Sequence, residues 1–151
     1  MPITEKINLK ELYEIDDYLW LEETIKLLKE KKFQELDLEN LIEELEDLGS
    51  EKRDAVESLL EQIIRHLLLL KYWASEYEQN RNHWESEIVS FRSQISDRMT
   101  TNFYNYLSEN LPSIYRKALK YVQKKSRLDT FPNSCPYSLE QLLDEDWFPQ
   151  K

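Results

Sequence analysis

His66 is the residue in this chain best suited to proton transfer or metal binding. It lies in the apolar run HLLLLKYW, where an imidazole could serve either chemistry. The residues four positions before and after it are glutamine and leucine, so this helix supplies no second ligand, and the pattern favours a structural histidine. If the helices flanking Asn80–Arg81 form an antiparallel hairpin, Arg92 and Arg98 lie within roughly a turn of His66. We therefore predict a buried polar cluster of His66, Arg92 and Arg98, in which burial and the nearby cations keep the imidazole neutral.

His83 and Glu87 form a second, weaker candidate for a ligand pair. Their spacing of four residues can place two ligands on one side of a helix, although a surface ion pair gives the same pattern. The chain has only two histidines, so any further ligand would have to be a carboxylate. The sequence itself indicates no catalytic residue, no metal site and no cofactor.

Five carboxylates close together resemble an acidic site when read as text: Glu39, Glu43, Glu44, Glu46 and Asp47. On a helix, however, they lie opposite or beside a leucine stripe, as on a solvated face. A dinuclear carboxylate site in a helical bundle would show Glu-x-x-His motifs, which are absent from this sequence. We interpret the carboxylates as surface, while glutamates from different helices could still converge as an acid–base pair.

The stretch from Arg116 to Arg127 is basic, with Tyr115 and Tyr121 interleaved. Such a helix could follow phosphates, or it could pair with the acidic N-terminal third of the same or another molecule. Residues 1–50 carry 15 acidic and 6 basic side chains, and the whole chain has a net charge of −10. This acidity argues against nucleic acid or an anionic membrane as a partner, and it suits a basic protein surface.

The segment that must position these residues is a central helix predicted at about 50–79, with apolar side chains on nearly every face. Gly49, the single glycine, is predicted to end the preceding helix, and Ser50 to cap the central one. Other helices are predicted at 18–31 after an Asp16 or Asp17 cap, from Leu38 to Leu48 after an Asp37 cap, from Trp84 towards Leu107, and at 112–126 beginning with Pro112.

Their apolar stripes complete the pattern of a bundle. The two N-terminal stripes comprise Tyr18, Leu21, Ile25, Leu28, Leu38, Leu41, Ile42, Leu45 and Leu48. The sequence therefore predicts an all-α, antiparallel bundle of about five helices around the buried central one.

Residues 1–15 are predicted to be a partly docked arm, and residues 16–151 a single domain. Its C-terminal tail, 129–151, is rich in proline and aromatic residues and is predicted to dock across the bundle. Ser138 with Gln141 forms a capping box that opens a short helix there. No apolar run reaches the roughly 20 residues of a membrane span. The lone Cys135 and the lack of a signal-peptide pattern lead us to expect a cytoplasmic protein.

Several segments together resemble a bacterial family, common in cyanobacteria, known as domain of unknown function number 29. They are DLENLIEELEDLGSEKR at Asp37–Arg53, HLLLLKYW at His66–Trp73, the later Trp84, and FPNSCPYSLEQLLDEDWFP at Phe131–Pro149. The resemblance covers roughly Asp17 to Pro149 and implies an all-helical protein without implying a reaction.

Two functional hypotheses follow. The first is a small interaction or regulatory module that binds a protein partner or self-associates and has no catalytic activity. The second is a metal-dependent or acid–base enzyme with a site around His66 and glutamates from neighbouring helices. The sequence leaves the partner, any substrate and the oligomeric state open.

Overall fold

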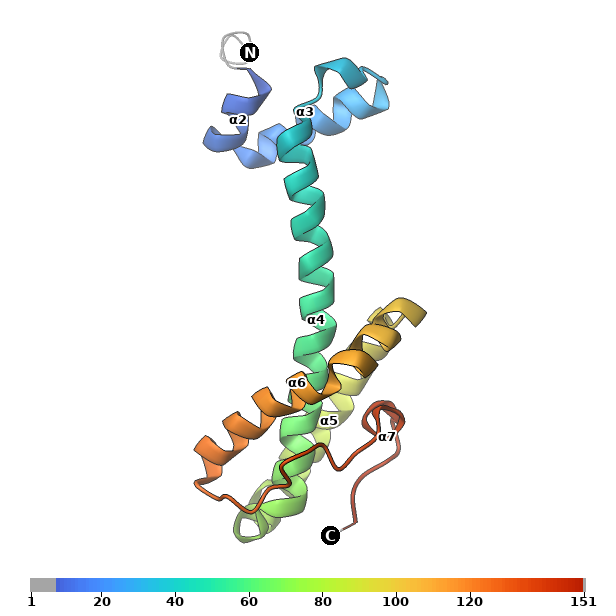
Figure 1. Ribbon diagram of the computed structural model, residues 1–151. Coiled ribbons are helices and arrows are strands. Elements are labelled where there is room, and N and C mark those ends of the chain that lie inside the picture. The colour runs from blue at the N-terminus through green and yellow to red at the C-terminus, as the bar shows by residue number, and fades with distance from the viewer. Residues whose placement is uncertain (1–7, 151) are drawn as a thin grey trace. The chain divides into compact units, whose positions relative to one another are not determined.

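The computed structural model describes residues 8–150, which are helical throughout apart from connections and the C-terminal tail (Figure 1). The α-helices are α2 (Leu9–Ile15), α3 (Asp17–Lys29), α4 (Leu38–Tyr72), α5 (Tyr77–Arg98), α6 (Thr101–Ser126) and α7 (Leu139–Leu143). Short 3₁₀ helices occupy Phe33–Glu35 and Ala74–Glu76, and no strand occurs among the described residues. The prediction of an all-α fold is confirmed. None of the described helices combines the length and apolarity needed to cross a bilayer.

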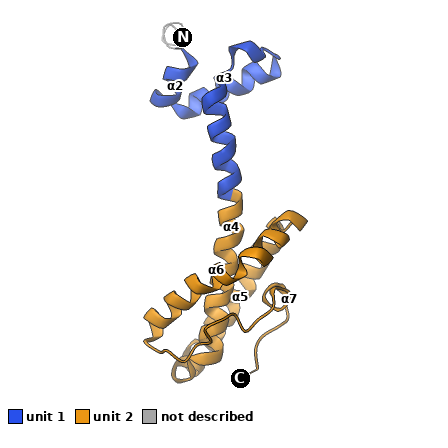
Figure 2. Ribbon diagram, in the orientation of Figure 1, with its two compact units in different colours: residues 1–51 blue, residues 52–151 orange. Residues whose placement is uncertain are grey.

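The chain divides into two compact units, residues 1–51 and residues 52–151 (Figure 2). The sequence-based prediction was an arm at 1–15 and one domain at 16–151; residues 1–7 of that arm lie outside the described residues. α4 contributes its first turns to the N-terminal unit and its remainder to the C-terminal unit.

Three predicted helix ends are wrong: the end at Gly49, the start at Ser50 and the end near residue 79. α4 begins earlier than the predicted central helix and stops before its predicted end. The helix runs without interruption from Leu38 to Tyr72, so Gly49 neither ends a helix nor adopts a positive φ, and Ser50 caps nothing. A glycine inside a helix costs only about 1 kcal/mol, which the surrounding leucines and glutamates offset. At the other end α4 stops at Tyr72, and the polar segment around Asn80 lies inside α5.

The predicted break at Pro112 is also wrong. Pro112 lies inside α6, which begins eleven residues earlier at Thr101. The chain turns instead at Met99, where Thr100 caps α6 by accepting a hydrogen bond from the backbone N–H of Phe103 at 3.1 Å. Proline removes one helical hydrogen bond, but the helix continues because Leu107 and Ile114 on either side are fully buried.

The capping predictions for two other helices are confirmed. The Asp16 carboxylate accepts a hydrogen bond from the N–H of Leu19 at 3.0 Å and so opens α3. Ser138 and Gln141 form a complete capping box at the start of α7. Short polar side chains satisfy backbone N–H groups that have no partner within the helix, which is why these signals are readable from sequence.

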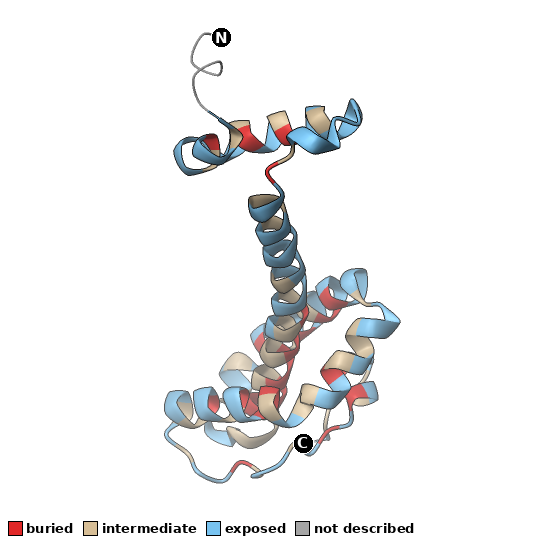
Figure 3. Cartoon of the chain, turned by 45° about the horizontal axis from the view of Figure 1, so that its top comes forward, coloured by how far each residue is buried: buried red, intermediate tan, exposed pale blue. Residues whose placement is uncertain are grey.

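The core of the C-terminal unit surrounds α4 between Val56 and Leu70 (Figure 3). Eight α4 side chains there are buried: Val56, Leu60, Ile63, Ile64, Leu67, Leu68, Leu69 and Leu70. α5, α6 and the tail complete the core, with Ile88, Leu107, Val122 and Leu142 among the buried residues. This part of the central-helix prediction is confirmed, because only a helix enclosed by neighbours can be apolar on so many faces.

Arg92 holds the C-terminal tail on this core. Its side chain is only 1% exposed, and its guanidinium donates hydrogen bonds to three tail carbonyls. The acceptors are the backbone oxygens of Leu142 at 2.9 Å, Trp147 at 2.7 Å and Gln141 at 3.0 Å. Burial lowers the pKa of Arg92, and nearby carboxylates of the tail act in the opposite direction. The docked tail predicted from sequence is thus fixed by a buried charge as well as by apolar contacts.

Arg92→Met should destabilise the protein by about 3 kcal/mol, because one buried and two partly buried carbonyls lose a charged donor. Methionine retains most of the aliphatic stem, so the loss reports mainly on the hydrogen bonds. Urea denaturation followed by circular dichroism measures the change. Arg98→Met, at an exposed position on the same helix, is the matched control. Equal stability of the two variants would show that Arg92 does not fix the tail.

Candidate functional site

His66 is anchored to its own helix. Its Nδ1 lies 2.7 Å from the carbonyl oxygen of Gln62, so this nitrogen carries the proton and donates. The ring packs on Phe91 at a centroid distance of 5.4 Å. Burial is the main cause of a lowered pKa for His66, and the hydrogen bond to Gln62 opposes it. A ring in this setting favours the neutral form near pH 7.

The buried polar cluster of His66, Arg92 and Arg98 stays a prediction. Within residues 8–150, no hydrogen bond or ion pair joins His66 to either arginine; Arg92 donates to the tail, and Arg98 is exposed. Arg92 follows the spacing of the buried residues Ile88 and Ile95 on α5. That spacing was the available signal that Arg92 faces the core.

His83 lines the same small cavity as His66, and its predicted partner Glu87 does not line it. The cavity measures about 300 Å³ and is bounded by both histidines, Trp73 and Trp84, among others. The two tryptophan rings stack at 6.0 Å. Within residues 8–150, no group of three or more His, Cys, Asp or Glu side chains could hold a metal ion. The cavity is thus lined by two imidazoles and the Glu76 carboxylate, which do not form such a group.

The N-terminal unit has a small interior centred on Trp20. Its indole is fully buried, and Nε1 donates to the Asp37 carboxylate at 3.2 Å. Asp37 also accepts from the side chain of Asn40 at 2.6 Å and from its backbone N–H at 3.4 Å, so it caps α4 as predicted. Tyr13 packs edge-on against Trp20 at 5.0 Å. These contacts fix α2, α3 and the start of α4 within the unit.

Most of the apolar side chains predicted as core in this unit are exposed (Figure 3). On α4, the exposed fractions are 57% for Leu38, 54% for Ile42, 60% for Leu45 and 48% for Leu48. On α3, Tyr18, Leu21, Ile25 and Leu28 are also exposed. Monomeric proteins rarely leave apolar side chains contiguous along a helix in water unless they bind something.

Carboxylates surround the α4 stripe. From Asp37 to Glu51 the sequence contains seven acidic residues and no basic one. Glu44 accepts a hydrogen bond from the Tyr13 hydroxyl at 2.8 Å, which raises the pKa of Tyr13 to about 12. Glu39 pairs with Lys10 at 2.7 Å. We call the surface formed by Leu38, Ile42, Leu45, Leu48 and these carboxylates the acidic apolar face.

Sequence reasoning found the residues of this face but misread their environment. Helical periodicity shows which side chains share a face, and it cannot show whether the chain itself supplies a cover. The available signal was the density of carboxylates beside the stripe, which is higher than a helix packed on both sides accommodates.

A family model described as "Domain of unknown function DUF29" matches residues 12–148 of the chain. No curated protein and no solved structure matches the chain significantly.

The lowered pKa of His66 predicts a pH dependence of stability. The unfolded chain binds a proton near pH 6.5 that the folded chain binds only at lower pH. The free energy of unfolding should therefore fall as pH drops below about 6.5, until the folded-state pKa is reached. Urea titrations between about pH 5 and pH 7.5 should show a smaller decrease for His66→Gln. Identical slopes for the wild type and His66→Gln would contradict the assignment.

Proposed function

The chain belongs to the DUF29 family, whose description assigns no activity, and on that premise we propose that it is a protein-binding module whose N-terminal unit docks a basic, amphipathic protein surface. The observation that carries this proposal is the acidic apolar face. Four large apolar side chains lie exposed along eleven residues of α4, within a stretch that contains seven carboxylates and no cation.

Apolar burial would supply most of the affinity. Fully burying a leucine or isoleucine side chain contributes about 1.5–3 kcal/mol, and these four are roughly half exposed before binding. Part of that gain is lost to the ordering of both partners. Leu38, Leu41, Leu45 and Leu48 also follow the three- and four-residue spacing of a coiled-coil seam, so an α-helix is the shape that fits best.

The carboxylates would select the partner. Like charges juxtaposed across an interface are costly, so an acidic helix is disfavoured, whereas lysine and arginine at the edge of the partner's apolar stripe are favoured. The same charges should disfavour nucleic acid and anionic lipid. We further propose that the protein acts in the cytoplasm, since its single cysteine can form no internal disulfide.

The alternative of an enzyme centred on His66 gains no support from the described geometry. The imidazole donates to a carbonyl of its own helix, and His83 and Glu76, which line the cavity beside it, form no metal-binding group of three within residues 8–150. We therefore propose no reaction.

A synthetic Lys/Leu peptide with amphipathic helical spacing should bind the full chain, as measured by fluorescence anisotropy of the labelled peptide. Ile42→Gln combined with Leu45→Gln should weaken binding by about tenfold or more, because two apolar contacts are lost. Glutamine is a good helix former, so α4 is preserved. The matched control is Val89→Gln, at an apolar position of α5 that is 55% exposed.

A scrambled peptide of the same composition tests for simple charge attraction, because it keeps the charge and loses the apolar stripe. Equal binding of the two peptides, or equal binding by the double variant and the control, would contradict the proposal.

A further inference from the structure

The C-terminal unit carries a basic groove between α4 and α6. The groove measures about 850 Å³, and the side chains that define its charge and shape are Glu61, Arg65, Lys117, Lys120, Tyr121 and Lys124. Four cations thus face one carboxylate. We call it the basic groove.

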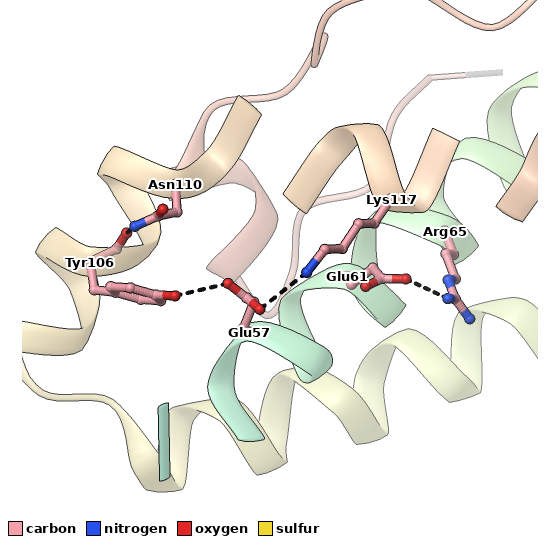
Figure 4. Close-up of polar contacts among 6 residues, drawn as sticks. All are labelled: Glu57, Glu61, Arg65, Tyr106, Asn110 and Lys117. Atoms are coloured by element: carbon pink, nitrogen blue, oxygen red, sulfur yellow. Dashed lines mark hydrogen bonds and ion pairs between the residues drawn. The ribbon is translucent and has the colours of Figure 1, made fainter. Parts of the chain in front are cut away.

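The single carboxylate is already engaged, so the groove remains positive. Glu61 forms an ion pair with Arg65 (Figure 4). The Arg65 guanidinium also stacks on Tyr121, with Cζ 3.7 Å from the ring centroid. This arrangement fixes the floor of the groove and leaves an aromatic edge beside the lysines.

The lysines are largely free to pair with an incoming anion. Lys117 reaches Glu57 only at 3.5 Å, and Glu57 also accepts a hydrogen bond from Tyr106 at 2.9 Å (Figure 4). Lys120 and Lys124 form no ion pair among the described residues, and both are exposed. Their long stems add apolar area around Tyr121.

The acidic apolar face has the matching spacing. Lys117, Lys120 and Lys124 follow steps of three and four residues along one face of α6. On α4, Glu46, Glu43 and Glu39 follow the same steps in the reverse direction; Glu46 and Glu39 flank Ile42, and Glu43 lies further round the helix, away from the stripe. With a rise of about 1.5 Å per residue, two antiparallel helices would bring these charges level in pairs. The row of lysines and the row of glutamates therefore match without a change in either helix.

We propose that a second copy of this chain fills the basic groove with its acidic apolar face. The inference rests on the proposed function and names a basic partner surface for it. This chain itself carries the acidic residues that match the groove, so a second copy supplies the helix that the groove requires. Each chain offers one face and one groove, and two copies can therefore form two equivalent contacts.

Charge distribution over the whole chain supports the pairing. Residues 1–51 hold sixteen acidic and six basic side chains, whereas residues 52–151 hold fourteen of each. The acidic face of one copy therefore meets the unit that carries no net charge, and the local field of the basic groove decides the contact. Because the charges are exposed, added salt weakens the association.

The test exchanges charges between the two surfaces in the full chain. One variant carries Glu43→Lys and Glu46→Lys, and the other carries Lys117→Glu and Lys120→Glu. In sedimentation equilibrium at low ionic strength, the apparent molecular mass of the wild type should rise with protein concentration, from the 18.4 kDa of one chain towards the mass of a dimer. Each variant alone should self-associate at least about tenfold more weakly, because both of its contacts become repulsive. An equimolar mixture should recover the dimer, since each altered surface then meets its complement.

The control carries Arg98→Glu and Arg116→Glu, which alter the net charge as much as the lysine variant does but lie outside the basic groove. It should self-associate like the wild type, and circular dichroism verifies that every variant is folded. A wild type that stays monomeric, or a mixture that does, overturns the inference. A decrease in hydrodynamic size at low salt that does not depend on protein concentration also overturns the inference, because it assigns the contact to a single molecule. If the Lys/Leu peptide still binds in that case, the proposed function survives; if it does not, both fail.

Discussion

The enclosure of α4 between Val56 and Leu70 is the constraint on which the C-terminal unit depends. Eight side chains there are buried on several sides of the helix, so neighbours must pack against most of its faces. α5 and α6 provide two of these neighbours, and the tail, held by Arg92, completes the enclosure. The same helix begins in the N-terminal unit with a stripe of leucine and isoleucine that is about half exposed. One helix thus combines a fully covered segment with an uncovered one, and the uncovered segment is the part available for binding.

Charge separates the two units as clearly as burial does. All of the net negative charge belongs to residues 1–51, and residues 52–151 are balanced. Within the balanced unit, four cations gather at the basic groove, and one carboxylate there is bound to Arg65. Exposed charges of this kind contribute little to folding, because solvent and salt screen them. They act strongly on the choice and orientation of a partner, and we therefore relate them to association.

Local signals in the sequence predicted the fold class, the cap at Asp16, the capping box at Ser138 and the docked tail. Each rests on residues within one or two helical turns of one another. The ends of α4 and α6 were predicted wrongly at Gly49 and Pro112, because burial of neighbouring apolar residues outweighs the local cost of glycine or proline. The acidic apolar face illustrates a second limit. Periodicity identified Leu38, Ile42, Leu45 and Leu48 as one stripe, but whether the chain covers a stripe depends on contacts far apart in sequence. Arg92 shows the same limit, since its three acceptors lie about fifty residues away.

The central claim is that the α4 stripe is a surface of the folded chain and not part of its core. The most direct test is the free energy of unfolding of Leu45→Gln in urea, measured with dilute protein and compared with Leu60→Gln, which alters a fully buried leucine of the same helix. Our account predicts a change within about 0.5 kcal/mol for Leu45→Gln, as for ordinary surface substitutions, and a loss of several kcal/mol for Leu60→Gln. A loss of about 2 kcal/mol or more for Leu45→Gln would place the stripe in the chain's own core and contradict the account.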